Sequence, residues 1–218
     1  MNHVRTTRRP LKSRDTLWAK SIARWMAKHG VRPNQISVLS FVNGCLAAVA
    51  LLGAGHVGSH GRGFLLLAAA AFIQFRLLCN LFDGMVAIEG GFKTKSGELY
   101  NELPDRFSDA VILIGAGYAL GATEPLHTLG WLAAVLSVIT AYVRALGASA
   151  GASQHFSGPM AKPQRMALMT LTCVVMAILG FCGIDVDLIH PVLGVISLGC
   201  LYTIALRTRR IAVELESK

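Results

Sequence analysis

The chain has 218 residues, of which 53% are hydrophobic and only 15% are charged, and its mean hydropathy is +0.52. A soluble domain of this length carries roughly a quarter charged residues, so the composition excludes an ordinary soluble protein and predicts an all-α integral membrane bundle. The formal net charge of +9 does not indicate a nucleic-acid partner, because the basic residues are not interleaved with aromatic residues. The positive net charge is better explained by basic residues that flank membrane spans on the cytoplasmic side.

The N-terminal segment, residues 1–33, is predicted to lie on the cytoplasmic side of the membrane. Residues 12–29 place apolar side chains, including Trp18 and Trp25, on one side of a helix and basic side chains mostly on the other. We therefore expect an amphipathic helix in the cytoplasmic interface, with its tryptophans at headgroup level. A solvated linker helix is the alternative. Pro33 then favours the start of a new helix.

Six apolar runs follow, each close to the ~20 residues that cross a bilayer as a helix. They cover residues 35–55, 63–88, 98–121, 128–147, 166–181 and 188–206. Glycines in the third run are expected to serve close helix packing. The five cysteines stand singly in apolar runs, so they are expected to pack rather than to bind metal or form disulfides.

Six spans place both ends of the chain on the same side of the membrane. The loops and the tail on that side are basic, whereas the opposite loops are neutral to acidic. Both termini are therefore predicted to be cytoplasmic, in a multi-pass protein of the cell (inner) membrane. The predicted organisation is a cytoplasmic segment (1–33), a six-helix membrane domain (34–208) and a cytoplasmic tail (209–218).

A polar segment separates the second apolar run from the third. Its side chains recur at helical spacing on two predicted helices, the first carrying Asn80, Asp83, Gly84 and Ala87 and the second carrying Gly97, Asn101 and Asp105. Two facing helices would bring two carboxylates and two amides to one site that opens to the cytoplasm. Such oxygen ligands, without Cys or His, suit Mg²⁺ or Mn²⁺. Ionisable side chains at the edge of a span are functional candidates, although helix-end carboxylates that merely face water are the alternative.

This segment resembles the signature of the CDP-alcohol phosphatidyltransferases, D-x2-D-G-x2-A-R-x8-G-x3-D-x3-D. The matching positions are Asp83, Gly84, Ala87, Gly97 and Asp105. The chain departs from the signature at three positions. Asn80 and Asn101 stand where the first and third aspartates are expected, and Ile88 stands where the arginine is expected.

The resemblance implies roles for the matching positions. In the family, four aspartates hold two divalent cations, Mg²⁺ or Mn²⁺, and the last aspartate takes a proton from the acceptor alcohol. Carried over, Asp105 is the catalytic base, and the metal ligands are Asn80, Asp83, Asn101 and Asp105. The two amides remove two negative charges, so affinity for a second cation should fall. The residues that match the nucleotide and donor site are Asn34, Gly84, Ala87, Thr94 and Gly97.

Two further groups of residues extend this candidate site. Three acids on or near the same face of the third predicted helix could compensate for the lost charges, or could simply face water or the bundle interior: Glu98, Glu102 and Asp109. A basic cluster on the cytoplasmic side could bind a phosphate of the acceptor or an anionic lipid headgroup: Arg144, Lys162 and Arg165. The alternative is that these residues only flank membrane spans on the cytoplasmic side, as basic residues commonly do.

The resemblance implies a transferase of phospholipid biosynthesis. It would move a phosphatidyl group from CDP-diacylglycerol to a polyol or polyol phosphate and release CMP. The implied partners are CDP-diacylglycerol, an alcohol acceptor, membrane lipids and a second copy of the chain in a homodimer. Two alternatives remain open: transfer from a CDP-alcohol to a diacylglycerol-type lipid, and a catalytically altered or inactive member that acts as a lipid- or nucleotide-binding membrane module.

Overall fold

The computed structural model describes residues 16–92, 97–121 and 123–218, and within these ranges the protein is helical and has no strands. The prediction of an all-α fold is confirmed. The helices are α1 (Leu17–Lys28), α2 (Pro33–Gly53), α3 (Ser59–Glu89), α4 (Gly97–Gly117), a short 3₁₀ helix (Ala119–Gly121), α5 (Glu124–Ser149), α6 (Lys162–Phe181) and α7 (Ile189–Glu216). As expected, α2 begins at Pro33, whose missing N–H costs nothing at a helix start.

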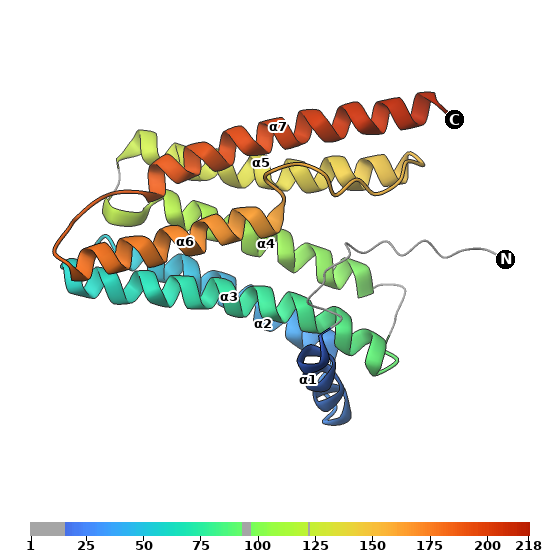
Figure 1. Ribbon diagram of the computed structural model, residues 1–218, viewed down its shortest axis with the longest axis horizontal. Helices are drawn as coiled ribbons and strands as arrows, with labels where there is room; N and C mark the ends of the chain where they lie inside the picture. Colours follow the sequence, from blue (N-terminus) through green and yellow to red (C-terminus); the bar gives the residue numbers. More distant parts are fainter. Residues whose placement is uncertain (1–15, 93–96, 122) are drawn as a thin grey trace.

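The six long helices lie side by side in a bundle (Figure 1). Helices α5 and α7 pack together on one side, α2 and α3 pack together on the other, and α4 and α6 lie between these pairs. α4 contacts α2 and α5, whereas α6 contacts α3 and α7. The interior consists mainly of aliphatic and small side chains, including the fully buried Leu51, Ile73, Ile112, Met169 and Leu193.

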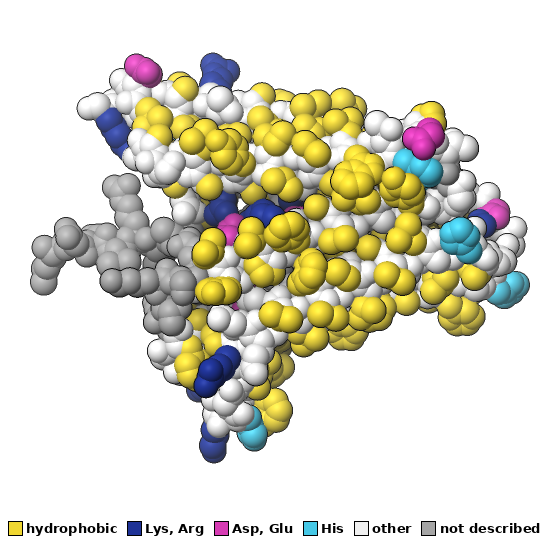
Figure 2. Space-filling model, turned by 180° about the vertical axis from the view of Figure 1, so that it is seen from behind, with side chains coloured by type: hydrophobic (Ala, Val, Ile, Leu, Met, Phe, Trp, Pro, Cys, Tyr) yellow, Lys and Arg dark blue, Asp and Glu magenta, His cyan; other side chains and the backbone are white. Residues whose placement is uncertain are grey.

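Five of these helices are long and apolar enough to cross a membrane: α2, α3, α5, α6 and α7. Figure 2 shows hydrophobic side chains covering the face in view, with charged side chains at the two ends of the bundle and in a hollow between helices. The protein is therefore a multi-pass membrane protein. α4 coincides with the third predicted span but is absent from this group, because several charged residues interrupt its first half. The count of six spans stays a prediction.

The glycines of α4 allow neighbouring backbones to approach closely. A Cβ on Gly115 would lie 2.9 Å from the Cα of Ala48 on α2, and a Cβ on Gly117 would lie 2.7 Å from the Cα of Gly130 on α5. Both glycines therefore serve close helix packing, as the sequence predicts. α4 can sit between α2 and α5 only because these two positions carry no side chain.

α1 packs across one end of the bundle against α3. Its small side chains Ala19 and Ala23 are buried, whereas Leu17, Trp18 and Trp25 are exposed. Trp18 packs edge-on against Phe82 of α3, with ring centres 6.1 Å apart, but it is still 49% exposed. The large apolar side chains of α1 are thus only partly covered by the bundle. This arrangement is compatible with a helix in the membrane interface, and that location stays a prediction.

The starts of α2 and α4 and the ends of α3, α5 and α7 lie at the same end of the bundle as α1 (Figure 1). We call this the site end. α6 is different, because it begins further inside the bundle, and residues 150–161 run back from the end of α5 to reach its start. The first turn of α6 is therefore placed beside the first half of α4.

Candidate active site

The polar faces of α3 and α4 meet at the site end. Arg76, Asn80 and Asp83 share one face of α3, because they are spaced four and three residues apart. Nδ2 of Asn80 donates a hydrogen bond to Oδ1 of Asp105 on α4 at 2.7 Å, and Oδ1 of Asn80 accepts one from the hydroxyl of Ser40 on α2 at 3.0 Å. The structure therefore brings Asn80 and Asp105 together, as their helical spacing predicts.

The two carboxylate oxygens of Asp105 have different surroundings. Oδ1 accepts hydrogen bonds from Asn80, from Nη2 of Arg76 at 2.8 Å and from the ammonium group of Lys162. Oδ2 accepts none from the described residues, and Nη2 of Arg106 lies 3.9 Å from it. The side chain is 8% exposed. Asp105 is therefore held through one oxygen, while the other accepts no hydrogen bond from a described residue.

Asp109, one turn further along α4, has both oxygens engaged. Oδ1 lies 2.5 Å from Nη2 of Arg76, and Oδ2 lies 2.9 Å from Nη2 of Arg165. Arg165 also donates to the carbonyl oxygen of Met160 at 2.8 Å. All three charged side chains are at most 1% exposed. Asp109 thus links α4 to α3 and α6, with an arginine at each of its oxygens.

Asp83 is buried and forms no direct ion pair with another described residue, although the charge of Lys162 acts on it at longer range. Its Oδ2 accepts a hydrogen bond from the hydroxyl of Ser37 at 3.2 Å, and its Oδ1 accepts one from the backbone N–H of Gly84. The residue is 2% exposed, and none of the ion pairs between described residues includes it. A buried carboxylate without a directly paired counter-charge is costly. Its surroundings therefore favour a bound cation.

Asn101 lies on α4 one turn before Asp105, and its half-buried side chain forms no hydrogen bond with a described residue. Because α3 and α4 run in opposite directions (Figure 1), Asp83 and Asn101 both lie about one helical turn, ~5 Å, nearer the site end than the Asn80–Asp105 pair. Their oxygens are thus candidates for a shared ligand.

These surroundings allow the fit of a divalent cation to be tested. Among the described residues, no three or more His, Cys, Asp and Glu side chains gather as a metal site. Asp83, with the amide oxygens of Asn80 and Asn101, offers the hard oxygen donors that suit one Mg²⁺ or Mn²⁺. Asp105 differs, because Arg76 and Lys162 already lie against it. The donor set fits one divalent cation on the Asp83 side.

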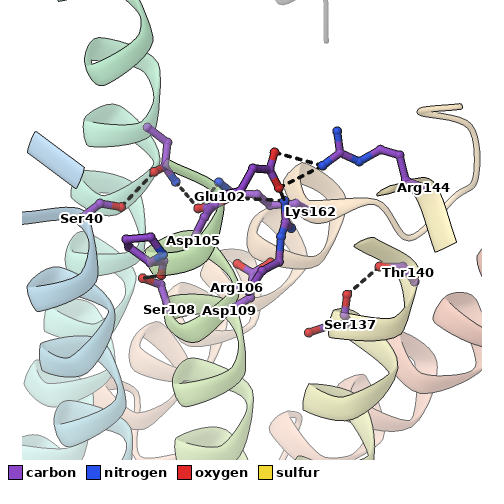
Figure 3. Close-up of polar contacts among 12 residues, drawn as sticks. Ser40, Glu102, Asp105, Arg106, Ser108, Asp109, Ser137, Thr140, Arg144 and Lys162 are labelled. Atoms are coloured by element: carbon purple, nitrogen blue, oxygen red, sulfur yellow. Dashed lines mark hydrogen bonds and ion pairs between the residues drawn. The ribbon is translucent and has the colours of Figure 1, made fainter. Parts of the chain in front are cut away.

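The predicted basic residues are brought to the same region, each paired with an acid of α4. Lys162 contacts Asp105, and Arg165 contacts Asp109. Nη2 of Arg144 lies 2.9 Å from both carboxylate oxygens of Glu102, and its guanidinium lies 5.2 Å from the ring centre of Phe156. Glu102 also pairs with Arg106. Ion pairs around the site therefore link α4 to α5 and α6 (Figure 3).

The residues predicted to border the nucleotide are less closely gathered. Gly84 and Ala87 are buried on α3, beside the Asp83 carboxylate, and Gly97 begins α4. Asn34 is exposed in the first turn of α2, and Ile88, which replaces the family arginine, is 55% exposed. Thr94 and the side chain of Glu98, also predicted at the site, lie outside the described parts of the chain.

Sequence reasoning missed three polar residues of the site. Arg76 is completely buried, and Ser37 and Ser40 of α2 bond to Asp83 and Asn80. Arg76 carried a signal, because an arginine inside a long apolar run needs a partner in the bundle. Figure 2 shows Lys, Arg, Asp and Glu side chains deep in a hollow between two groups of helices, close to the site end.

Comparisons with known proteins agree with this architecture. The chain is 28% identical to phosphatidylinositol phosphate synthase of Corynebacterium glutamicum over 192 residues, which cover 85% of this chain and 80% of that protein. It is 27% identical to the inner membrane protein YnbA of Escherichia coli over 154 residues, which cover 71% and 72% of the two chains.

Solved structures share the fold. The crystal structure of Mycobacterium tuberculosis phosphatidylinositol phosphate synthase (PgsA1) with CDP-DAG bound matches with a TM-score of 0.72 and 20% identity, over 88% of this chain and 92% of that one. The same enzyme was also crystallised with manganese and citrate. The profile of the CDP-alcohol phosphatidyltransferase family matches residues 31–206, which include every described residue of the site. The chain belongs to the CDP-alcohol phosphatidyltransferase family.

Proposed function

We propose that this protein transfers a phosphatidyl group from CDP-diacylglycerol to a polyol or polyol phosphate and releases CMP. Membership of the family and the likeness to phosphatidylinositol phosphate synthases support the reaction class. The observation that carries the proposal is the half-engaged carboxylate of Asp105. It is fixed by three donors at Oδ1, and Oδ2 accepts no hydrogen bond from the described residues.

The proposed reaction assigns a task to each oxygen of Asp105. Oδ1 keeps the carboxylate in place, and Oδ2 accepts the proton of the acceptor hydroxyl as its oxygen attacks the β-phosphorus of the donor. The bond between that phosphorus and the bridging oxygen breaks, and CMP leaves with the electron pair. A positioned carboxylate contributes through orientation and general base catalysis.

The proposed cofactor is Mg²⁺ or Mn²⁺, held on the Asp83 side of the site with oxygens of Asn80 and Asn101. A divalent cation of this kind neutralises charge that develops on phosphate oxygens. The basic residues Lys162 and Arg144 lie on the other side, where a phosphate of the acceptor is proposed to bind between charges already paired with α4.

The membrane arrangement is part of the proposal. α4 has 21 residues and lies between α2 and α5, both of which are candidate spans, so we infer that α4 crosses the membrane with them. The site end, where the basic residues of α1 and the end of α7 lie, would then face the cytoplasm. The homodimer implied by the family resemblance stays a prediction, and the mass of the protein in detergent tests it.

The proposed reaction is tested by CMP release from CDP-diacylglycerol. Purified protein in detergent is supplied with Mg²⁺ or Mn²⁺ and a panel of polyols and polyol phosphates. We expect release that requires one acceptor and that falls by about 100-fold or more in Asp105→Asn, because a general base contributes ~10²–10⁴-fold. Asp185→Asn, a carboxylate change at the far end of the bundle, should leave the rate unchanged. Full activity of Asp105→Asn would remove Asp105 as the base.

A second candidate function is a membrane module that binds nucleotide or lipid without catalysis. The replacement of two metal-ligand aspartates by Asn80 and Asn101 favours it, as does the pairing of Asp105 with Arg76. Binding of CDP-diacylglycerol without CMP release for any acceptor would support this module and contradict the transferase.

A further inference from the structure

Arg76 is a buried cation with unused hydrogen-bonding capacity. It lies in the apolar part of α3 and is 0% exposed. Nη2 donates to the carbonyl oxygen of Asp105 at 3.1 Å and to the carboxylates of Asp105 and Asp109. Nε and Nη1 are buried and have no hydrogen-bond partner among the described residues. A guanidinium carries five N–H donors, and here only those of Nη2 are engaged, with one carbonyl and two carboxylate oxygens.

Lys162 approaches the same carboxylate from another helix. Its ammonium group donates to Oδ1 of Asp105, and its side chain is 20% exposed. An ammonium group has three N–H donors. Lys162 is therefore the accessible member of the pair and Arg76 the enclosed one.

The charges of α3 and α4 divide the site into two halves. In the Asp105 half, two cationic side chains and one amide lie against a single carboxylate oxygen. In the Asp83 half, a carboxylate that is 2% exposed has only a hydroxyl and a backbone N–H as hydrogen-bond partners among the described residues, and Lys162 acts on it only at longer range. A divalent cation is attracted to the second half and repelled by the fixed charges of the first.

We propose that Arg76 and Lys162 take the place of one of the two divalent cations, so that the protein binds a single Mg²⁺ or Mn²⁺, on Asp83. Lys162 supplies the positive charge that faces an anionic phosphate group, and Arg76 fixes Asp105 so that its Oδ1 is not a metal ligand. Arg76 is thus a positioning residue. This inference rests on the proposed function for the phosphate, but the number of bound ions does not depend on turnover.

The test is the stoichiometry of Mn²⁺ bound to the full chain in detergent, measured by calorimetry and by the spin-resonance signal of free Mn²⁺. We expect one ion per chain for wild type, none for Asp83→Asn and one for Asp105→Asn. Two ions for wild type, no ion for wild type, or equal loss of the ion in Asp105→Asn and Asp83→Asn would each overturn the proposal.

A gain of the second ion provides the complementary test. Asn80→Asp with Asn101→Asp restores the family aspartates but leaves Arg76, and we expect it still to bind one ion. Adding both Arg76→Gln and Lys162→Gln to these two changes should raise the stoichiometry to two, whereas adding Arg76→Lys alone should not. Arg62→Gln, an arginine on the same helix at the far end, is the matched control and should add nothing. A second ion that appears while Arg76 is intact would contradict its role.

The two proposals fail separately. One Mn²⁺ per chain without CMP release would retain the single-ion site and contradict the transferase. CMP release with two ions per chain would retain the transferase and overturn the single-ion site.

Discussion

Two aspartates one turn apart on α4 differ in what their oxygens contact. Asp105 keeps one oxygen without a hydrogen bond from a described residue, whereas Asp109 has each oxygen paired with a buried arginine. Both side chains are buried, so burial alone does not separate their roles. The number of hydrogen-bonded oxygens does separate them. A carboxylate with both oxygens paired to buried arginines holds helices together, whereas a carboxylate with one oxygen outside any such pair can accept a proton from a substrate.

The stability of the bundle should depend on Asp109. In Asp109→Asn, Arg76 and Arg165 each lose a charged partner inside the bundle, and breaking a buried pair in this way costs about 3–5 kcal/mol. We expect a clearly lower midpoint of thermal unfolding in detergent. Asp185→Asn removes an exposed ion pair with Arg62, worth about 0–1 kcal/mol, and should unfold like wild type. Equal midpoints for the two variants would show that the Asp109 pairs do not hold the helices together.

At the scale of elements, the site depends on two features of helix packing. α4 approaches α2 and α5 closely through its glycines, which places its first half at the centre of the site end. α6 begins deep in the bundle, so that the Lys162 and Arg165 side chains reach Asp105 and Asp109. Neither acid would have its partner from α6 if that helix began at the same level as the end of α5.

The packing of α4 against α5 can be tested at Gly117. In Gly117→Ala, the new Cβ would lie 2.7 Å from the Cα of Gly130, a backbone atom that cannot move without shifting α5. Overpacking of this kind costs about 1–3 kcal/mol, and we expect a lower unfolding midpoint. Gly194→Ala in α7 is the matched control, since a Cβ there has no neighbour within 4 Å and Ala favours the helix. A loss of stability in the control as large as in Gly117→Ala would argue against a packing effect.

At the scale of the whole molecule, charge is distributed unevenly between the two ends of the bundle. The site end carries the basic residues of α1, the charged cluster of α4 and α6, and the basic end of α7, whereas the far end carries Arg62, Glu124, Asp185 and Asp187. The positive-inside rule predicts that the site end is cytoplasmic. A water-soluble nucleotide and polyol would then reach the hollow from the cytoplasm.

This orientation can be measured with the natural cysteines. Cys182 is the exposed one of the five, all of which lie in described residues, and it follows α6 at the far end. We expect a membrane-impermeant maleimide to label Cys182 in intact cells. In a Cys182→Ser background, Ser217→Cys after α7 should be labelled only once the membrane is permeabilised. The reverse pattern would place the site on the outside of the membrane.

Much of the site follows from local sequence patterns. The spacing of polar residues on α3 and α4 places Asn80 opposite Asp105, and Pro33 marks the start of α2, because helical periodicity and proline chemistry act over a few residues. The apolar runs determine which helices can cross a membrane, although the charged first half of α4 leaves that helix outside the group of five.

Only the tertiary structure decided which charges neutralise one another. The sequence shows acids on α4 and basic residues some 30 to 60 positions away, at Arg76, Lys162 and Arg165, but the spacing along the chain does not say which acid each will reach. That outcome depends on the depth at which α6 begins and on how closely α4 packs between its neighbours. These are properties of helices in contact, set by side-chain volumes across interfaces, and local propensity contains no information about them.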